Sequence, residues 1–206
     1  MPYKETLIIM IRNPLKGLVK SRLATEAGIE KAYRVYKQLL VRLHINTISL
    51  PYRKLLFYDR YIDTDDQWNS TNFEKHLQSE GDIGDRMKCA FELVFKKGAD
   101  KVILIGSDTP ELDEVILSSA YRLLDHHDVV LGPANDGGYY LIGMNRSIPS
   151  LFNNKVWGEN QVLRDTLQEI KQMNISFKLL PELIDIDTLD DLNESGFDDR
   201  FQDKLA

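Results

Sequence analysis

The chain has 206 residues, of which 43% are hydrophobic and 28% are charged, so its composition excludes disordered, collagen-like and low-complexity proteins. Its 26 lysines and arginines against 32 aspartates and glutamates give a net charge of -6, which disfavours a nucleic acid partner. A single cysteine, Cys89, excludes an intrachain disulfide and a cysteine-based zinc site. We expect its thiol to be inert and buried or half-buried.

Apolar runs in this sequence are short. The longest, such as residues 7–11, reach about a quarter of the roughly 20 residues that a membrane-spanning helix needs. The N-terminal segment has no basic flank and no small-residue cleavage site, so no secretion signal is expected. We therefore expect one cytoplasmic domain over residues 1–206, with no membrane span.

These apolar runs alternate with stretches of helical periodicity, a pattern typical of a mostly parallel sheet with helices on both faces. In chain order, strands are predicted at residues 6–11, 55–58, 73–78, 101–105, 128–131, 139–143 and 175–180. Helices are predicted around residues 32–43, 87–95, 111–124 and 163–170. The sequence thus predicts a three-layer α/β/α sandwich.

Ligands of open α/β sheets bind beyond the carboxyl ends of the strands, so the loops after the strands matter most. The first of these loops carries Arg12, Lys16, Gly17, Lys20 and Arg22, a set suited to binding phosphate. Its spacing excludes a Walker A loop. The alternative is a solvated basic loop with a turn glycine, whose exposed charges add little to stability.

A second loop, residues 81–87, leads into a predicted helix that Asp82 or Asp85 is expected to cap. Arg86 in this loop either pairs with a carboxylate or contacts a nucleotide. After the strand at residues 101–105, Thr109 is predicted to cap the next helix, with Pro110 at its first position.

That cap leaves Asp108 free, and a free carboxylate at a strand end suits Mg²⁺ or Mn²⁺ held together with substrate phosphates. Asp185 and Asp187 follow the last strand, and residues two apart in an extended segment face the same side. Both could therefore bind one divalent cation. The alternative is a structural role beside a helix cap made by Thr188 and Asp191.

The turn Asp136-Gly137-Gly138, followed by Tyr139, fits two interpretations. Such a turn closes a β-hairpin, but paired glycines also let a sugar approach the backbone, with the carboxylate of Asp136 accepting hydrogen bonds from hydroxyls. Further along the chain, Trp157 and Glu159 could offer a stacking face and a carboxylate to an acceptor. Alternatively, the Trp157 side chain belongs to the core.

Five motifs in this order resemble a bacterial family of GT-A-like nucleotide-diphospho-sugar transferases, the arsenosugar-biosynthesis-type glycosyltransferases. They are RNPLKGLVKSRL at residues 12–23, GDIGDRM at 81–87, GSDTP at 106–110, GPANDGGYYLIG at 132–143 and DIDTLDDL at 185–192. The first and last motifs also resemble the phospholactate guanylyltransferase-like nucleotidyltransferases. The likeness extends from about Leu7 to Leu192.

The resemblance implies a Rossmann-like GT-A fold and a set of site residues at matching positions. It assigns nucleotide binding to Arg12, Gly17, Lys20 and Arg22, and metal binding to Asp108, Asp185 and Asp187. The loop residues themselves add Arg86 as a candidate for nucleotide binding, and Gly137, Gly138, Tyr139, Trp157 and Glu159 as candidates for substrate binding. Asp136 and Asp108 are the catalytic candidates, with Glu159 and Asp190 also eligible as a base. The family often has Ser or Thr after the tryptophan, whereas this chain has Gly158, Glu159 and Asn160.

The expected function is a metal-dependent glycosyltransferase that uses a nucleotide sugar, a small-molecule acceptor, and Mg²⁺ or Mn²⁺. One alternative is a nucleotidyltransferase that joins a nucleoside triphosphate to a phosphorylated small molecule and releases pyrophosphate. Another is a nucleotide-binding protein without catalysis, which would not need Asp108 and Asp187. The residues leave the base, the sugar, the acceptor and the oligomeric state open.

Overall fold

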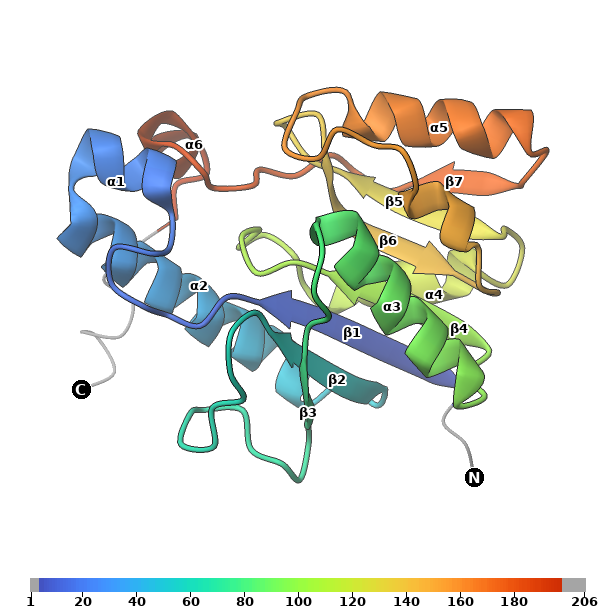
Figure 1. Cartoon of the computed structure of the whole chain (residues 1–206), viewed down its shortest axis with the longest axis horizontal. Helices are drawn as coiled ribbons and strands as arrows, with labels where there is room; N and C mark the ends of the chain where they lie inside the picture. Colours follow the sequence, from blue (N-terminus) through green and yellow to red (C-terminus); the bar gives the residue numbers. More distant parts are fainter. Residues whose placement is uncertain (1–3, 198–206) are drawn as a thin grey trace.

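The computed structural model describes residues 4–197, which form a seven-stranded sheet with the strand order β3-β2-β1-β4-β6-β5-β7 (Figure 1). The strands are β1 (Glu5–Ile11), β2 (Arg53–Tyr58), β3 (Glu74–Leu77), β4 (Lys101–Ile105), β5 (Val129–Pro133), β6 (Tyr139–Met144) and β7 (Phe177–Leu179). Strand β6 pairs antiparallel with β4 and β5, and the other neighbouring strands pair in parallel. The predicted mostly parallel sheet is confirmed.

Helices lie on both faces of the sheet (Figure 1). They are α1 (Ser21–Ala27), α2 (Ile29–Ile48), α3 (Ile83–Lys96), α4 (Glu114–Leu123), α5 (Val162–Gln172), α6 (Leu189–Glu194) and a short 3₁₀ helix (Pro149–Phe152). Side chains of β1 alternate between two buried clusters, with Leu7 and Ile9 facing α2 and α4, and Ile8 and Met10 facing α3 and α5. The three-layer α/β/α architecture follows from these two clusters.

Two local predictions were wrong. Helix α4 begins at Glu114, three residues later than expected, because the side chain of Asp113 accepts a hydrogen bond from the N–H of Ile116 at 2.9 Å and caps the helix there. Thr109 and Pro110 lie before that cap, in the connection that leaves β4. Cys89 is exposed on α3, not buried or half-buried.

The sheet topology brings the candidate loops together at one edge of the sheet, which is formed by the carboxyl ends of the parallel strands. The parallel strands β1 to β4 all end there, and so does β5, which turns back into β6 through residues 134–138. The segment after β7 crosses the same edge, where the N–H of Ile186 donates to the carbonyl of Asp108 at 3.0 Å. Distant motifs of the sequence therefore meet at this edge.

No helix in residues 4–197 combines the length and the apolar character needed to cross a membrane.

Candidate functional site

A cavity of about 560 Å³ opens at this edge of the sheet. Most of the predicted site residues line it: Arg12, Arg86, Asp108, Asp136, Gly138, Tyr139, Trp157, Glu159 and Asp185. The remaining ones, which are Gly17, Lys20, Arg22, Gly137 and Asp187, are not among the lining residues. The structure therefore brings residues of the five motifs together around one cavity.

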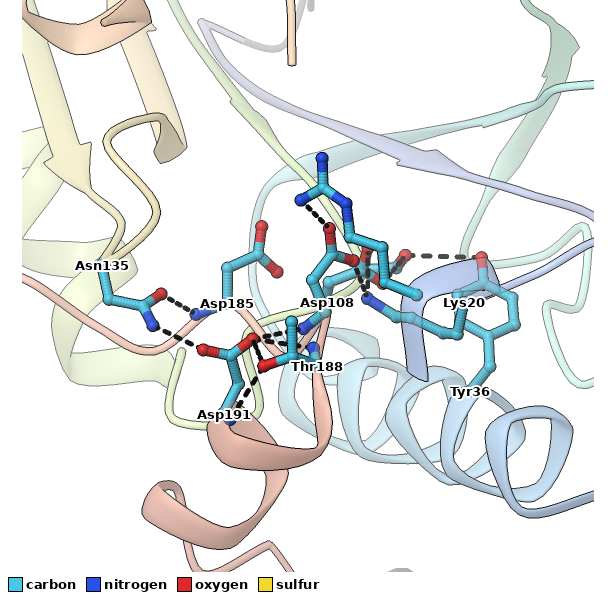
Figure 2. A network of polar contacts seen from close by, with 10 residues as sticks. Lys20, Tyr36, Asp108, Asn135, Asp185, Thr188 and Asp191 are labelled. Atoms are coloured by element: carbon cyan, nitrogen blue, oxygen red, sulfur yellow. Dashed lines mark hydrogen bonds and ion pairs between the residues drawn. The ribbon is translucent and has the colours of Figure 1, made fainter. Parts of the chain in front are cut away.

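Lys20 joins two of these motifs (Figure 2). Its ammonium lies 2.8 Å from Oδ2 of Asp108 and 3.2 Å from Oδ1 of Asp187, and its side chain is only 2% exposed. The alternative interpretation, a solvated basic loop, therefore does not apply to this lysine. Arg22 reaches the other oxygen of Asp187 at 3.4 Å from an exposed position, as expected for a surface charge.

Burial alone would lower the pKa of Lys20, but the carboxylates of Asp108, Asp185 and Asp187 outweigh burial and raise it above the usual lysine value. Lys20 is therefore a fixed positive charge at neutral pH. Its backbone lies in the left-handed region, with φ of 50°, where it precedes the first residue of α1. This turn directs the side chain inward to the carboxylates.

Tyr36 of α2 links the loop after β1 to the loop after β4, and no feature of the sequence indicated this role. Its hydroxyl accepts a hydrogen bond from the N–H of Arg12 at 2.8 Å, donates to the carbonyl of Arg12 at 3.0 Å and lies 3.4 Å from Oγ of Ser107. The Ser107 hydroxyl in turn donates to Oδ1 of Asp108 at 2.8 Å. A tyrosine within an apolar helical stripe predicts only a core residue, so the hydroxyl could not be recognised from the sequence.

Tyr36→Phe should remove the hydroxyl while keeping the ring in the core. We expect the free energy of unfolding to fall by about 1–2 kcal/mol, because the Arg12 backbone loses its partner. We also expect nucleotide affinity, measured by calorimetry, to fall several-fold. The loops that carry Arg12 and Asp108 would lose the hydroxyl group that links them.

The control is Tyr121→Phe, since the Tyr121 hydroxyl is buried with no hydrogen-bond partner in the described part of the chain. It should change neither quantity appreciably. Equal nucleotide affinity in Tyr36→Phe and the parent would limit Tyr36 to a structural role.

Asp185 faces Asp108 across the edge of the cavity. Its Oδ1 is buried and has no hydrogen-bond partner among residues 4–197. Burial, together with the neighbouring carboxylates of Asp108, Asp187 and Asp136, raises the pKa of Asp185 to about 8, although Lys20 opposes the shift. The group therefore lacks sufficient positive charge nearby and would be stabilised by a further cation.

The carboxylates of Asp108 and Asp185 fit a hard divalent cation, which proteins often bind with one or two carboxylates plus substrate phosphates. The unpartnered oxygen of Asp185 is the observation that supports this fit. Asp187 lies beside this pair, because its carboxylate shares the ammonium of Lys20 with Asp108 and also contacts Arg22. No group of three or more His, Cys, Asp or Glu side chains within residues 4–197 is arranged to hold a metal ion alone.

Asn135 fixes the segment that carries Asp185 against the β5–β6 turn (Figure 2). Its Oδ1 accepts from the N–H of Asp185 at 2.9 Å, and its Nδ2 donates to Oδ1 of Asp191 at 2.9 Å. Asp191 and Thr188 form the predicted capping box of α6. The cap interpretation therefore holds for these two residues and leaves Asp185 without a capping role.

On the other side of the cavity, Arg86 donates to the carbonyl of Gly81 at 3.1 Å and to Oε1 of Gln78 at 3.2 Å. These partners are neutral oxygens, not the carboxylate that a structural ion pair would supply. Asp82 accepts from the N–H of Asp85 at 2.9 Å and caps α3, which confirms one of the two predicted caps. Arg86 therefore keeps its full charge for the cavity that it lines.

The turn after β5 closes an antiparallel hairpin, so that interpretation of its glycines is confirmed. Gly137 has φ of 85°, and a Cβ atom there would collide with the carbonyl oxygen of Asn160. It is glycine because another backbone segment packs on it. Gly138 instead lines the cavity, and its N–H donates to Oδ1 of Asp136 at 2.8 Å.

Gly137→Ala and Gly138→Ala should therefore behave differently. Gly137→Ala should lower the free energy of unfolding by at least about 2 kcal/mol, because it combines a positive φ with a backbone collision. Gly138→Ala should stay within about 1 kcal/mol of the parent, since its nearest contact is the movable side chain of Asp136 at 3.1 Å. Denaturant unfolding of both variants measures the difference, and similar losses would contradict these separate roles.

Trp157 lies between the core and the cavity. Its half-buried ring packs on Gly84 of α3, where a Cβ atom would collide with the indole, and it also lines the cavity. Glu159 is exposed at the cavity wall. The loop that carries them is anchored on α3 through Gly84 and on the hairpin turn through Gly137.

The fold is that of the nucleotide-diphospho-sugar transferases and nucleotidyltransferases, as comparison with solved structures shows. A protein from Desulfovibrio desulfuricans G20, provisionally described as a nucleotide-diphospho-sugar transferase, is 31% identical, with a TM-score of 0.86 over 93% of this chain and 85% of that one. Rv0371c from Mycobacterium tuberculosis H37Rv, in complex with manganese, is 10% identical, with a TM-score of 0.54 over 93% and 97% of the two chains. CMP:2-keto-3-deoxy-manno-octonic acid synthetase complexed with CTP is 12% identical, with a TM-score of 0.55 over 98% and 100%.

Residues 49–159 match the family described as "Uncharacterized protein conserved in bacteria (DUF2064)", and the chain belongs to this family. The match includes Asp108 and the hairpin turn. No curated protein matches the sequence.

Proposed function

We propose that this protein is a metal-dependent glycosyltransferase that transfers a sugar from a nucleotide-diphospho-sugar to a small-molecule acceptor. The observation that carries this proposal is the pair of Asp108 and Asp185, with an unpartnered carboxylate oxygen, beside the buried ammonium of Lys20. The 31% identity to the Desulfovibrio protein supports it.

Mg²⁺ or Mn²⁺ bound by Asp108 and Asp185 would neutralise the diphosphate and stabilise the nucleoside diphosphate as it leaves. Lys20 lies beside the same carboxylates and can exchange part of its ion pairing for a phosphate oxygen. Arg12 and Arg86 line the cavity and supply the guanidinium groups that pair with phosphate. These residues form the part of the site that binds the nucleotide.

The β5–β6 side of the cavity would hold the sugar and the acceptor. Asp136 lies there with one carboxylate oxygen bonded to the N–H of Gly138, which fixes its direction. In the proposed reaction it would accept the proton of the acceptor hydroxyl as a general base. Trp157 offers a flat face to a sugar ring, and Glu159 accepts hydrogen bonds from hydroxyls.

A second candidate is nucleotidyl transfer from a nucleoside triphosphate to a phosphorylated small molecule. The cations Lys20, Arg12 and Arg86 favour it, because a triphosphate needs more positive charge than a diphosphate. A binding protein without catalysis is the third possibility, and the direction in which Asp136 is held argues against it.

One experiment separates the three functions. Thermal unfolding is first measured with uridine, guanosine, cytidine and thymidine nucleotides and their sugars, with and without Mn²⁺, since a ligand that binds only the folded protein raises its melting temperature. The ligand with the largest shift is then incubated with candidate acceptors. Release of a nucleoside diphosphate supports glycosyl transfer, release of pyrophosphate supports nucleotidyl transfer, and binding without turnover supports the third possibility.

A further inference from the structure

The charges that line the cavity divide between its two sides. The guanidinium groups of Arg12 and Arg86 lie on the side of β1, β2 and β3, where Gln78 ties Arg86 to the carbonyls that end β1 and β2. Asp136 lies in the turn between β5 and β6, and Glu159 lies in the loop that packs on this turn, where the backbone of Asn160 contacts Gly137. The two sides of the cavity therefore suit different parts of a ligand.

Carboxylates on the β1–β3 side already have partners. Oδ1 of Asp59 accepts from the N–H of Asn13 at 2.7 Å, and its other oxygen lies 3.6 Å from Arg60. Asp82 caps α3. On this side the carboxylates therefore lie near cations, because Asp59 has Arg60 beside it and the guanidinium groups of Arg12 and Arg86 line the cavity.

On the β5–β6 side, Asp136 accepts a hydrogen bond from the N–H of Gly138, but no ion pair of Asp136 or Glu159 with a cation is present within residues 4–197. Among residues 4–197, no lysine or arginine lines the cavity on that side. The nearby Lys155 is buried and paired with Glu169 at 2.8 Å, so its charge is used elsewhere. Asp185 lines the same cavity with a buried oxygen that has no hydrogen-bond partner among residues 4–197.

Like charges in a partly enclosed cavity repel more strongly than in bulk water, because the surrounding protein screens them less. A carboxylate or phosphate on the ligand would therefore be disfavoured beside Asp136 and Glu159. Neutral hydroxyls gain hydrogen bonds from the same carboxylates, and an amino group would also gain charge attraction.

We propose that the β5–β6 side of the cavity selects a transferred sugar without negative charge, a neutral or amino sugar and not a uronate or phosphosugar. This inference rests on the proposed function, because it assumes a nucleotide sugar whose diphosphate lies at Asp108 and Asp185. It adds the chemical class of the sugar and names Asp136 and Glu159 as the residues that determine it.

The test compares two donors that differ only in the charge of the sugar. The nucleotide panel selects the base, and calorimetry with Mn²⁺ then measures the affinities of UDP-glucose and UDP-glucuronate, or of GDP-mannose and GDP-mannuronate. We expect the neutral sugar to bind at least about tenfold more tightly than the uronate. Equal affinities, or tighter binding of the uronate, would overturn the inference.

Two variants locate the effect. Asp136→Asn combined with Glu159→Gln should reduce the preference to less than about threefold, because amides keep the hydrogen-bonding shape but remove the charge. Asp59→Asn makes the same charge change on the opposite side and should keep the tenfold preference. If Asp59→Asn reduced the preference as much as the double variant, the assignment to Asp136 and Glu159 would be wrong.

The outcome also separates this inference from the proposed function. Mn²⁺-dependent nucleotide binding without a preference between the paired sugars would overturn only the sugar class. Absence of any nucleotide binding would overturn both, because the inference depends on the nucleotide site.

Discussion

Asp108→Asn should lower the affinity for nucleotide in the presence of Mn²⁺ by about 100-fold or more. The amide keeps the shape of the side chain and can still accept the hydrogen bond from Ser107, which the aspartate receives at 2.8 Å. It loses the negative charge that a divalent cation requires. Calorimetric titration of the nucleotide with and without Mn²⁺ measures the change.

Asp113→Asn is the matched control, because it makes the same substitution five residues further along the chain. Asp113 caps α4, and asparagine is an equally good cap, so both stability and nucleotide binding should stay close to the parent. Parental Mn²⁺-dependent affinity in Asp108→Asn would remove Asp108 from the proposed metal site.

Lys20→Met should lower the free energy of unfolding by about 2–3 kcal/mol. Removing one member of a buried ion pair leaves the other charges uncompensated, which costs about 3–5 kcal/mol when all partners are buried. The carboxylates of Asp108 and Asp187 are 33% and 39% exposed, so solvent screens part of this loss. Nucleotide affinity should fall as well.

The control here is Lys16→Met in the same loop, since the Lys16 side chain is 54% exposed and pairs only with the exposed Glu30. Denaturant unfolding should place it within about 0.5 kcal/mol of the parent. If Lys20→Met were equally mild, the buried ammonium would not be holding the carboxylates together.

Much of the fold could be predicted because its central strands β1, β2, β4, β5 and β6 are short apolar runs buried on both faces. The position of the site also followed from the sequence. Because loops after parallel strands meet at one edge of the sheet, Asp108, Asp136 and Asp185 could be expected to lie close together there. The start of α4 was wrong because Thr109-Pro110 and Asp113 are competing caps, and the choice between them depends on tertiary packing.

The site was harder to predict where a role depends on a partner distant in sequence. The basic residues of the first loop predicted phosphate binding or a solvated loop, but neither interpretation included the buried ion pair of Lys20 with a residue 167 positions away. Tyr36 joins two loops through a hydroxyl that periodicity cannot reveal. Gly137 is explained by the backbone of Asn160, which only the folded chain brings near.

The most direct measurement is a crystal structure of the protein with Mn²⁺ and the nucleotide that the thermal panel selects, recorded with the anomalous signal of manganese. The proposed function predicts one manganese peak between the carboxylates of Asp108 and Asp185. The diphosphate should bind the same ion, with Lys20 turned toward a phosphate oxygen. A manganese peak elsewhere, or a nucleotide bound away from this edge of the sheet, would contradict the proposed function.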